Sequence, residues 1–363
     1  MPSISAGPPR APNACGIIVE NSEVLPEFTL ADPDAAAEIR VRHLLTHTSG
    51  IDGDVFLDTG DGDDCVEKYV KELRTAVSVT VPGGPLSYCN AGFVVAGRMV
   101  EVLRGNVWDD VLVERIYQPL GLDHVITRAK DAPLFRTAVG HVKIGAGTDE
   151  VIPVTTWMLP RSMGPAGLIT GSAESLLTFG AAHLRDGLGL TGERIVSAES
   201  ARLMRTLHTS LSAVSSTQQG WGLGWNLEQW GAETSVSHLG GTIGQVASLH
   251  TFHEQQVAIV SLANSRGGDG FNRQMRTLVG TYDSTLTRWQ ITQDADRRLW
   301  IGMTSKNTVL GEPDPEPQLM KPAGRDRFLA TVDGAEMEFA YLEYAGKHYL
   351  YNLRLYERAD ASA

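Results

Sequence analysis

The sequence predicts an α+β protein, with an antiparallel sheet flanked by helices, a helical lobe and a small C-terminal all-β appendage. Three observations lead to this class. Helical periodicity dominates residues 58–210. Two runs rich in β-branched residues, 246–252 and 257–262, are joined by four residues as in a hairpin. Beyond residue 289, short aromatic and β-branched runs alternate with Gly, Pro and Asp turns.

Composition sets limits on the function. The chain has 363 residues, 42% hydrophobic and 20% charged, which suits a globular protein of one large or two smaller domains. A net charge of −12 with scattered basic residues argues against nucleic-acid binding. No apolar run approaches the ~20 residues of a membrane-spanning helix. Three cysteines and an N-terminus without a cationic start or apolar run predict a cytoplasmic protein as encoded.

The N-terminal elements follow from proline and capping signals. The first thirty residues carry five prolines and are expected to be irregular. Asp32 followed by Pro33 is typical of a helix cap and a first helical turn, leading toward Leu44 and Leu45. Gly50 ends this element.

The central region predicts a series of helices. An acidic loop, 58–64, precedes an amphipathic helix that carries apolar residues from 66 to 73. A helix over 90–104 ends at Gly105, and another over 106–120 ends at Gly121. Further helices begin at caps Ser172 and Ser197.

The last part of the chain predicts mainly strands. After the hairpin, a helix is expected from residue 271 to about residue 289. Strands are expected in four later runs, 298–303, 328–332, 337–344 and 348–356. The chain is therefore divided into a first domain, 1–288, and an appendage, 289–363.

Three motifs, in residues 41–50 (VRHLLTHTSG), 88–90 (YCN) and 238–241 (HLGG), together resemble those of the serine β-lactamase and penicillin-binding-protein superfamily. The resemblance covers about residues 17–285. It is closest to the esterases and D-peptidases related to class C β-lactamases. The fold it implies is β-lactamase-like, with a first domain that is N-terminally incomplete.

The resemblance implies a serine hydrolase or acyltransferase that works through an acyl-enzyme. Tyr88 would relay a proton near the serine oxygen, Asn90 would contact the substrate, and His238 would stand on the opposite wall. Gly240 and Gly241 would let the substrate approach the strand closely, and the Gly241 N–H is the candidate oxyanion donor. The implied partner is a small-molecule acyl substrate, an ester, amide or lactam. Esterase, D-amino-acid peptidase or acyltransferase chemistry fits better than lactam destruction.

Each motif also has a structural interpretation. Tyr88 could pack in the core while Asn90 caps a helix, and residues 238–241 could be an ordinary glycine turn. His43 and His47 are interpreted as buried, hydrogen-bonded scaffold residues, and residues 164–170 as a structural strand. No metal is expected, although the i, i+4 spacing of the two histidines allows a metalloenzyme as a third hypothesis.

The nucleophile is the open question, because the sequence contains no Ser-x-x-Lys. Ser3 and Ser5 precede Ala6 and two prolines, which argues against an active-site helix there. One hypothesis is therefore a serine hydrolase whose N-terminal segment is absent from this sequence. The other is a non-catalytic relative that keeps the cleft for binding. The sequence has no phosphate loop or dinucleotide fingerprint, so no cofactor is expected. It does not indicate an oligomeric state.

Overall fold

A computed structural model describes most of the chain. The described residues are 24–53, 55–143, 151–157, 159–211, 218–230, 233–265, 280–283, 287–294, 299–306, 315–324, 327–332, 335–345, 347–352 and 354–359. The early proline-rich residues, Ser3, Ser5 and the first part of the helix expected from residue 271 lie outside these ranges.

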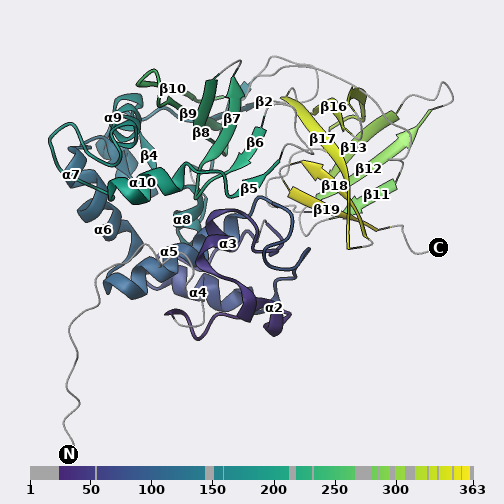
Figure 1. Cartoon of the computed structure of the whole chain (residues 1–363), viewed down its shortest axis with the longest axis horizontal. Coiled ribbons are helices and arrows are strands. Elements are labelled where there is room, and N and C mark those ends of the chain that lie inside the picture. The colour runs from purple at the N-terminus through teal and green to yellow at the C-terminus, as the bar shows by residue number, and fades with distance from the viewer. Residues whose placement is uncertain are drawn as a thin grey trace, which may run out of the picture.

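The helical elements lie mainly before residue 205, as the periodicity predicts (Figure 1). They are α2 Pro33–Glu38, α3 Val41–Leu45, α4 Cys65–Glu72, η2 Leu73–Thr75, α5 Asn90–Arg104, α6 Trp108–Leu112, η3 Val113–Tyr117, α7 Gln118–Leu120, η4 Ala129–Leu134, η5 Arg161–Met163, α8 Gly164–Gly167, α9 Ala173–Leu184 and α10 Ala198–Met204.

The first sheet has six antiparallel strands in the order β10-β9-β8-β7-β6-β5. Their bounds are β5 Thr209–Ser210, β6 Gln218–Trp221, β7 Asn226–Trp230, β8 Glu233–Thr242, β9 Gln245–Phe252 and β10 Val257–Ala263. The predicted hairpin is confirmed, since Val257 pairs with Phe252 across the turn. Helix α9 packs on β9 and β10. Two short pairs complete this half: β1 Val125–Ile126 with β4 Thr170–Gly171, and β2 His141–Lys143 with β3 Val151–Pro153.

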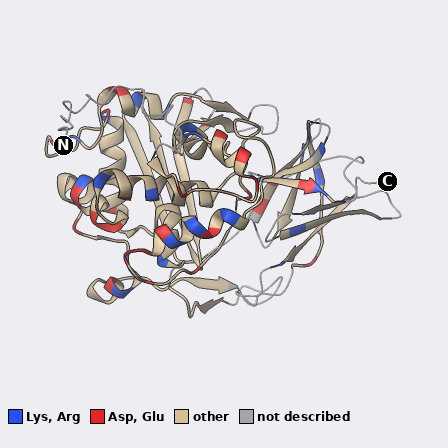
Figure 2. Ribbon diagram, turned by 90° about the horizontal axis from the view of Figure 1, so that it is seen from below, with Lys and Arg blue, Asp and Glu red and all other residues tan. Residues whose placement is uncertain are grey.

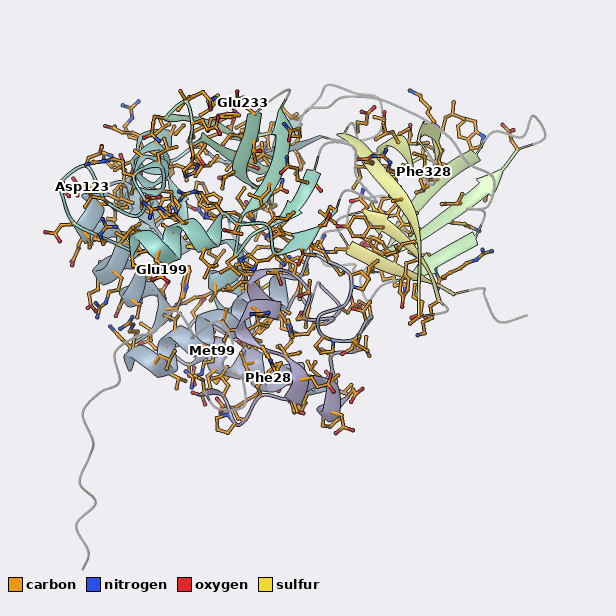
Figure 3. The ribbon with its side chains drawn as sticks, viewed as in Figure 1. Phe28, Met99, Asp123, Glu199, Glu233 and Phe328 are labelled. Carbon is orange, nitrogen blue, oxygen red and sulfur yellow. The ribbon has the colours of Figure 1, made fainter. Side chains whose placement is uncertain are left out.

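The helical lobe is built around α5, which buries Val94, Val95 and Met99. Phe28 and Met99, both labelled in Figure 3, belong to the same apolar cluster. The predicted stop at Gly105 is confirmed: this residue adopts φ +65° and its N–H donates to the Glu101 carbonyl. Together α3, α4, α5 and α8 form one body below the six-stranded sheet in Figure 1.

The second sheet is all β, which confirms the predicted appendage. Its nine antiparallel strands run in the order β14-β13-β12-β11-β19-β18-β17-β16-β15. Their bounds are β11 Gly280–Asp283, β12 Thr287–Gln293, β13 Leu299–Ser305, β14 Gln318–Leu319, β15 Lys321–Gly324, β16 Arg327–Val332, β17 Ala335–Tyr344, β18 Lys347–Asn352 and β19 Arg354–Arg358. Because β14 also contacts β16, the sheet curls around a core that includes Trp289, Phe328 and Phe339. Phe328 is labelled in Figure 3.

The nine-stranded sheet docks against the rest of the chain through apolar packing and a hydrogen bond. Leu86, Leu211 and Trp221 pack against Tyr349 and other residues of the sheet. The Tyr349 hydroxyl donates to the Val79 carbonyl at 3.2 Å. The chain's division at residue 288 stays a prediction.

Several predicted elements are wrong in detail. Residues 280–283 and 287–293 form strands β11 and β12, not the end of a helix, because Trp289 and Ile291 alternate into the core of the second sheet. The element expected from Asp32 toward Leu45 is two helices, because extended Ile39 and Arg40 separate α2 from α3. The run 348–356 is likewise two strands, β18 and β19.

Two further predictions are corrected in the helical lobe. Residues 164–167 are a helical turn with Pro165 in its first turn, and strand structure is limited to Thr170 and Gly171. The helix predicted over 106–120 begins at Trp108 and passes through a π-turn. In Figure 2, basic residues on the helices are interspersed with acidic ones.

Candidate active site

Tyr88 lies in the loop before α5, and one residue holds the backbone on both sides of it. The Ser87 N–H donates to the His47 carbonyl at 2.8 Å. The Cys89 N–H donates to His47 Nδ1 at 3.0 Å. His47 therefore fixes the position from which the Tyr88 side chain projects.

His47 is buried, which suits a residue that holds the Tyr88 loop in place. It is 1% exposed, which confirms its interpretation as a scaffold residue, and its backbone adopts φ +56°. Desolvation, followed by the charges of His238 and Arg354, lowers the pKa of His47 well below its ordinary value. Because Nδ1 accepts a hydrogen bond, the neutral ring carries its proton on Nε2. His43 is only half-buried, and its Nδ1 accepts from the Arg40 N–H.

A cluster of rings surrounds Tyr88 and brings two predicted site residues together. The Tyr88 ring centroid lies 4.1 Å from that of His47 and 6.3 Å from that of His238. Trp221 contacts both of these residues: its ring centroid lies 5.9 Å from that of Tyr88 and 5.8 Å from that of His238. We call Tyr88, His47, His238 and Trp221 the ring cluster. The phenol and the imidazole thus belong to one local site.

His238 comes to this cluster on β8, the strand that carries the glycine motif. Desolvation lowers its pKa, so the neutral imidazole is favoured near neutral pH. Gly240 follows on the same sheet face, paired with Ala247, and Gly241 pairs with Val246. Both glycines are exposed, so this stretch of backbone is accessible from solvent. The motif is a strand, not a glycine turn.

Asn90 is the first residue of α5, and Cys89 occupies the N-cap position. The Cys89 thiol, 1% exposed, accepts a hydrogen bond from the Gly92 N–H at 3.2 Å. The Asn90 N–H donates to the Gly53 carbonyl at 3.0 Å. Asn90 is therefore not the helix cap, and its half-buried side chain lies at the helix N-terminus beside Tyr88.

The Tyr88 loop approaches Gly53 so closely that a side chain there would collide with it. A Cβ at position 53 would lie 2.2 Å from the Tyr88 carbonyl oxygen and 3.1 Å from Arg354 Nε. Gly53 is therefore required by the close packing of two backbone segments and one arginine.

Arg354 is a neighbour of Tyr88 that the sequence did not reveal. Its guanidinium carbon lies 5.2 Å from the centroid of the Tyr88 ring, within the range of a cation–π contact. The next residue, Leu355, donates its N–H to Ser87 Oγ at 3.0 Å. These residues begin β19 and reach the site only because the second sheet docks there, and no local motif marks that.

The serines close in sequence to His47 and Tyr88 do not offer an exposed nucleophile. Ser87 is 3% exposed and accepts from Leu355, and Ser49 is 1% exposed and accepts from the Ile51 N–H. Among the described residues, no group of three or more His, Cys, Asp or Glu side chains is placed to hold a metal ion. Nor does the described part of the chain include a helix long and apolar enough to cross a membrane.

Comparisons with known proteins identify the family of the chain. The profile of the family described as Beta-lactamase matches residues 21–282. Penicillin-binding protein 4 of Amycolatopsis lactamdurans is 38% identical over 262 residues, which are 71% of this chain and 68% of that protein.

Solved structures extend the likeness in fold to the second sheet. The structure of SurE matches with a TM-score of 0.66 at 20% identity, over 93% of this chain and 83% of SurE. The D-amino acid amidase of Ochrobactrum anthropi SV3 matches with a TM-score of 0.57 at 24% identity, over 70% of each chain. The family profile and the 38% identity decide the assignment, and this chain belongs to the beta-lactamase family.

Proposed function

We propose that the ring cluster is the acyl-transfer site of a serine hydrolase that acts on small esters or amides. The observation that carries this proposal is the approach of Tyr88 and His238, whose ring centroids are 6.3 Å apart. A phenol and an imidazole that meet beside an accessible glycine strand provide a proton relay next to backbone N–H groups.

The proposed chemistry passes through an acyl-enzyme. A serine oxygen attacks the substrate carbonyl, and the alcohol or amine leaves with a proton supplied through Tyr88. Water or an amine then attacks the acyl group and releases the product. In this proposal Asn90 holds the substrate amide, His238 lines the opposite wall, and the Gly241 N–H donates to the oxyanion.

The substrate class is proposed from the chain's relatives. The amidase among them is named for D-amino acids, and the 38% identical relative is a penicillin-binding protein. Both names concern acyl donors with an amide bond. From the name of the amidase we favour amide or ester substrates with a D-configured residue as the proposed class.

A second function is favoured by the sequence itself. The motif Ser-x-x-Lys does not occur in the 363-residue sequence, and both Ser49 and Ser87 are buried. A site without a nucleophile would bind an acyl compound without forming an ester to it. The alternative is therefore a β-lactamase-like binding protein.

Covalent labelling separates the two functions. The purified chain is treated with a fluorophosphonate probe and with a fluorescent penicillin, and peptide mass spectrometry locates any labelled serine. Labelling that falls in Tyr88→Phe and His238→Ala but persists in His208→Ala supports the hydrolase. His208 is exposed and lies outside the ring cluster, which makes it a matched control.

The opposite result favours the binding protein. If the chain binds an ester substrate reversibly but no serine is labelled, this polypeptide is not a hydrolase. Reading the coding DNA upstream for an in-frame Ser-x-x-Lys then tests whether a nucleophile is encoded there.

A further inference from the structure

The second sheet reaches the Tyr88 loop with the first two residues of β19. The Arg354 guanidinium lies over the Tyr88 ring at 5.2 Å, and the Leu355 N–H donates to Ser87 Oγ at 3.0 Å. Ser87 directly precedes Tyr88, so both contacts act on the same short segment. We propose that the second sheet is a component of the active site, in which Arg354 is the positioning residue for Tyr88.

The contacts of Arg354 and Leu355 with the Tyr88 loop are partly or fully buried. Arg354 is partly buried, and its Nε would lie 3.1 Å from a Cβ at Gly53, so the side chain packs closely against Gly53 as well as the Tyr88 ring. Leu355 is 2% exposed and Ser87 is 3% exposed, which places their hydrogen bond in the protein interior. A buried hydrogen bond and a partly desolvated cation–π contact each hold geometry better than exposed ones.

The surrounding packing ties the same two parts together. Leu355 belongs to an apolar cluster with Leu86, Trp221 and Tyr349, and Tyr88 packs against this cluster. Leu86 lies two residues before Tyr88, and Trp221 is in the ring cluster. The docking surface of the second sheet is therefore continuous with the site.

Two supports act on Tyr88 from separate parts of the fold. His47 holds the backbone of residues 87 and 89 from the helical lobe. Arg354 and Leu355 hold the ring and Ser87 from β19. The loop bonds to His47 set the backbone from which the phenol projects, and the Arg354 guanidinium packs on the ring itself, so the two supports act on different parts of Tyr88.

This inference rests on the proposed function for its meaning, but its test needs no turnover. The protein is labelled with 3-fluorotyrosine, and the fluorine NMR line that disappears in Tyr88→Phe identifies Tyr88. In Arg354→Gln, this line is expected to move toward the position of free fluorotyrosine. In Arg354→Lys, which keeps a cation, it is expected to move less.

Two further variants make the result specific. Ser87→Ala removes the acceptor for the Leu355 N–H and is expected to move or broaden the same line. Arg327→Gln is the matched control, because Arg327 lies on β16 of the same sheet and pairs there with Glu338. It is expected to leave the Tyr88 line in place.

The proposal is overturned if the Tyr88 line is unchanged in Arg354→Gln, or if Arg327→Gln moves it equally. Should Arg354→Gln fail to fold, the comparison of Arg354→Lys and Ser87→Ala with the parent decides in its place. A chain that no acyl probe labels would still give this NMR result, so the two proposals fail separately.

Discussion

Ser87 Oγ accepts a hydrogen bond from the backbone N–H of Leu355, and 268 residues of chain separate the two. Both residues are buried, and the bond joins the Tyr88 loop to the second sheet. The last described strand, β19, therefore meets the Tyr88 loop at the candidate site, and several measurable consequences follow from the contacts around it.

Gly53→Ala is expected to destabilise the protein by about 1–3 kcal/mol, the usual cost of overpacking. The new Cβ would lie 2.2 Å from the Tyr88 carbonyl oxygen, so the loop must move. Urea unfolding measures the change. Gly167→Ala is the control, since nothing lies within 4 Å of a Cβ there, and its stability should equal or exceed that of the parent. Equal stability of both variants would contradict the close approach at Gly53.

His47→Phe is expected to cost about 1–3 kcal/mol, because the buried Cys89 N–H loses its acceptor. The phenyl ring keeps the contact with Tyr88 but cannot accept a hydrogen bond. Amide hydrogen exchange at Cys89 and urea unfolding check the two effects. Slow exchange at Cys89 in the variant would show that His47 Nδ1 is not its partner.

The protein is expected to lose stability as the pH falls from 6.5 toward 4, and His183 is one cause. Burial lowers the pKa of His183 to about 4, so the unfolded chain takes up this proton first. With an unfolded pKa of about 6.5, the free energy of unfolding should fall by about 2 kcal/mol between pH 7.5 and pH 5 through this residue. Below pH 4 the folded state also binds the proton and the loss stops.

His183→Leu should remove that part of the pH dependence. Urea unfolding at pH 7.5 and pH 5 gives the difference for the parent and the variant. His208→Leu, at an exposed position, should keep the parent's slope. An unchanged slope in His183→Leu would contradict the burial of a neutral imidazole.

Arg161→Met is expected to cost about 1.5–3 kcal/mol, the usual worth of hydrogen bonds to a charged group, because the buried Asp109 carboxylate then keeps Arg128, at 3.4 Å, but loses Arg161. Arg161 donates to Asp109 at 2.8 Å and also holds Asp61 and Asp63, so the acidic loop at 58–64 is anchored rather than only solvated. Arg74→Ala, which removes an exposed pair with Glu72, should change stability by less than about 1 kcal/mol. Thermal unfolding compares the two.

Local signals in the sequence predicted the elements whose ends depend on a few neighbouring residues. Gly105 ends α5, and the Ser172 and Ser197 hydroxyls accept from the backbone N–H groups of the helices they begin. The family resemblance, expected over residues 17–285, agrees with the profile match over 21–282.

What the sequence did not reveal depends on pairing between distant segments. Residues 280–293 have an apolar pattern that suits a helix, yet β11 pairs with β19 and β12 with β13. Pairing with distant strands therefore decided between the helical period of 3.6 residues and the strand period of two. Arg354 carries no local signal, because its role depends on the docking of a whole sheet. The roles of Tyr88, Asn90, His238, Gly240 and Gly241 stay predictions.

Trp221 packs both in the ring cluster and in the apolar contact with the second sheet. A substitution of Trp221 therefore changes both contacts at once. A variant designed to alter the ring cluster at Trp221 should also change how the C-terminal strands pack against the rest of the chain.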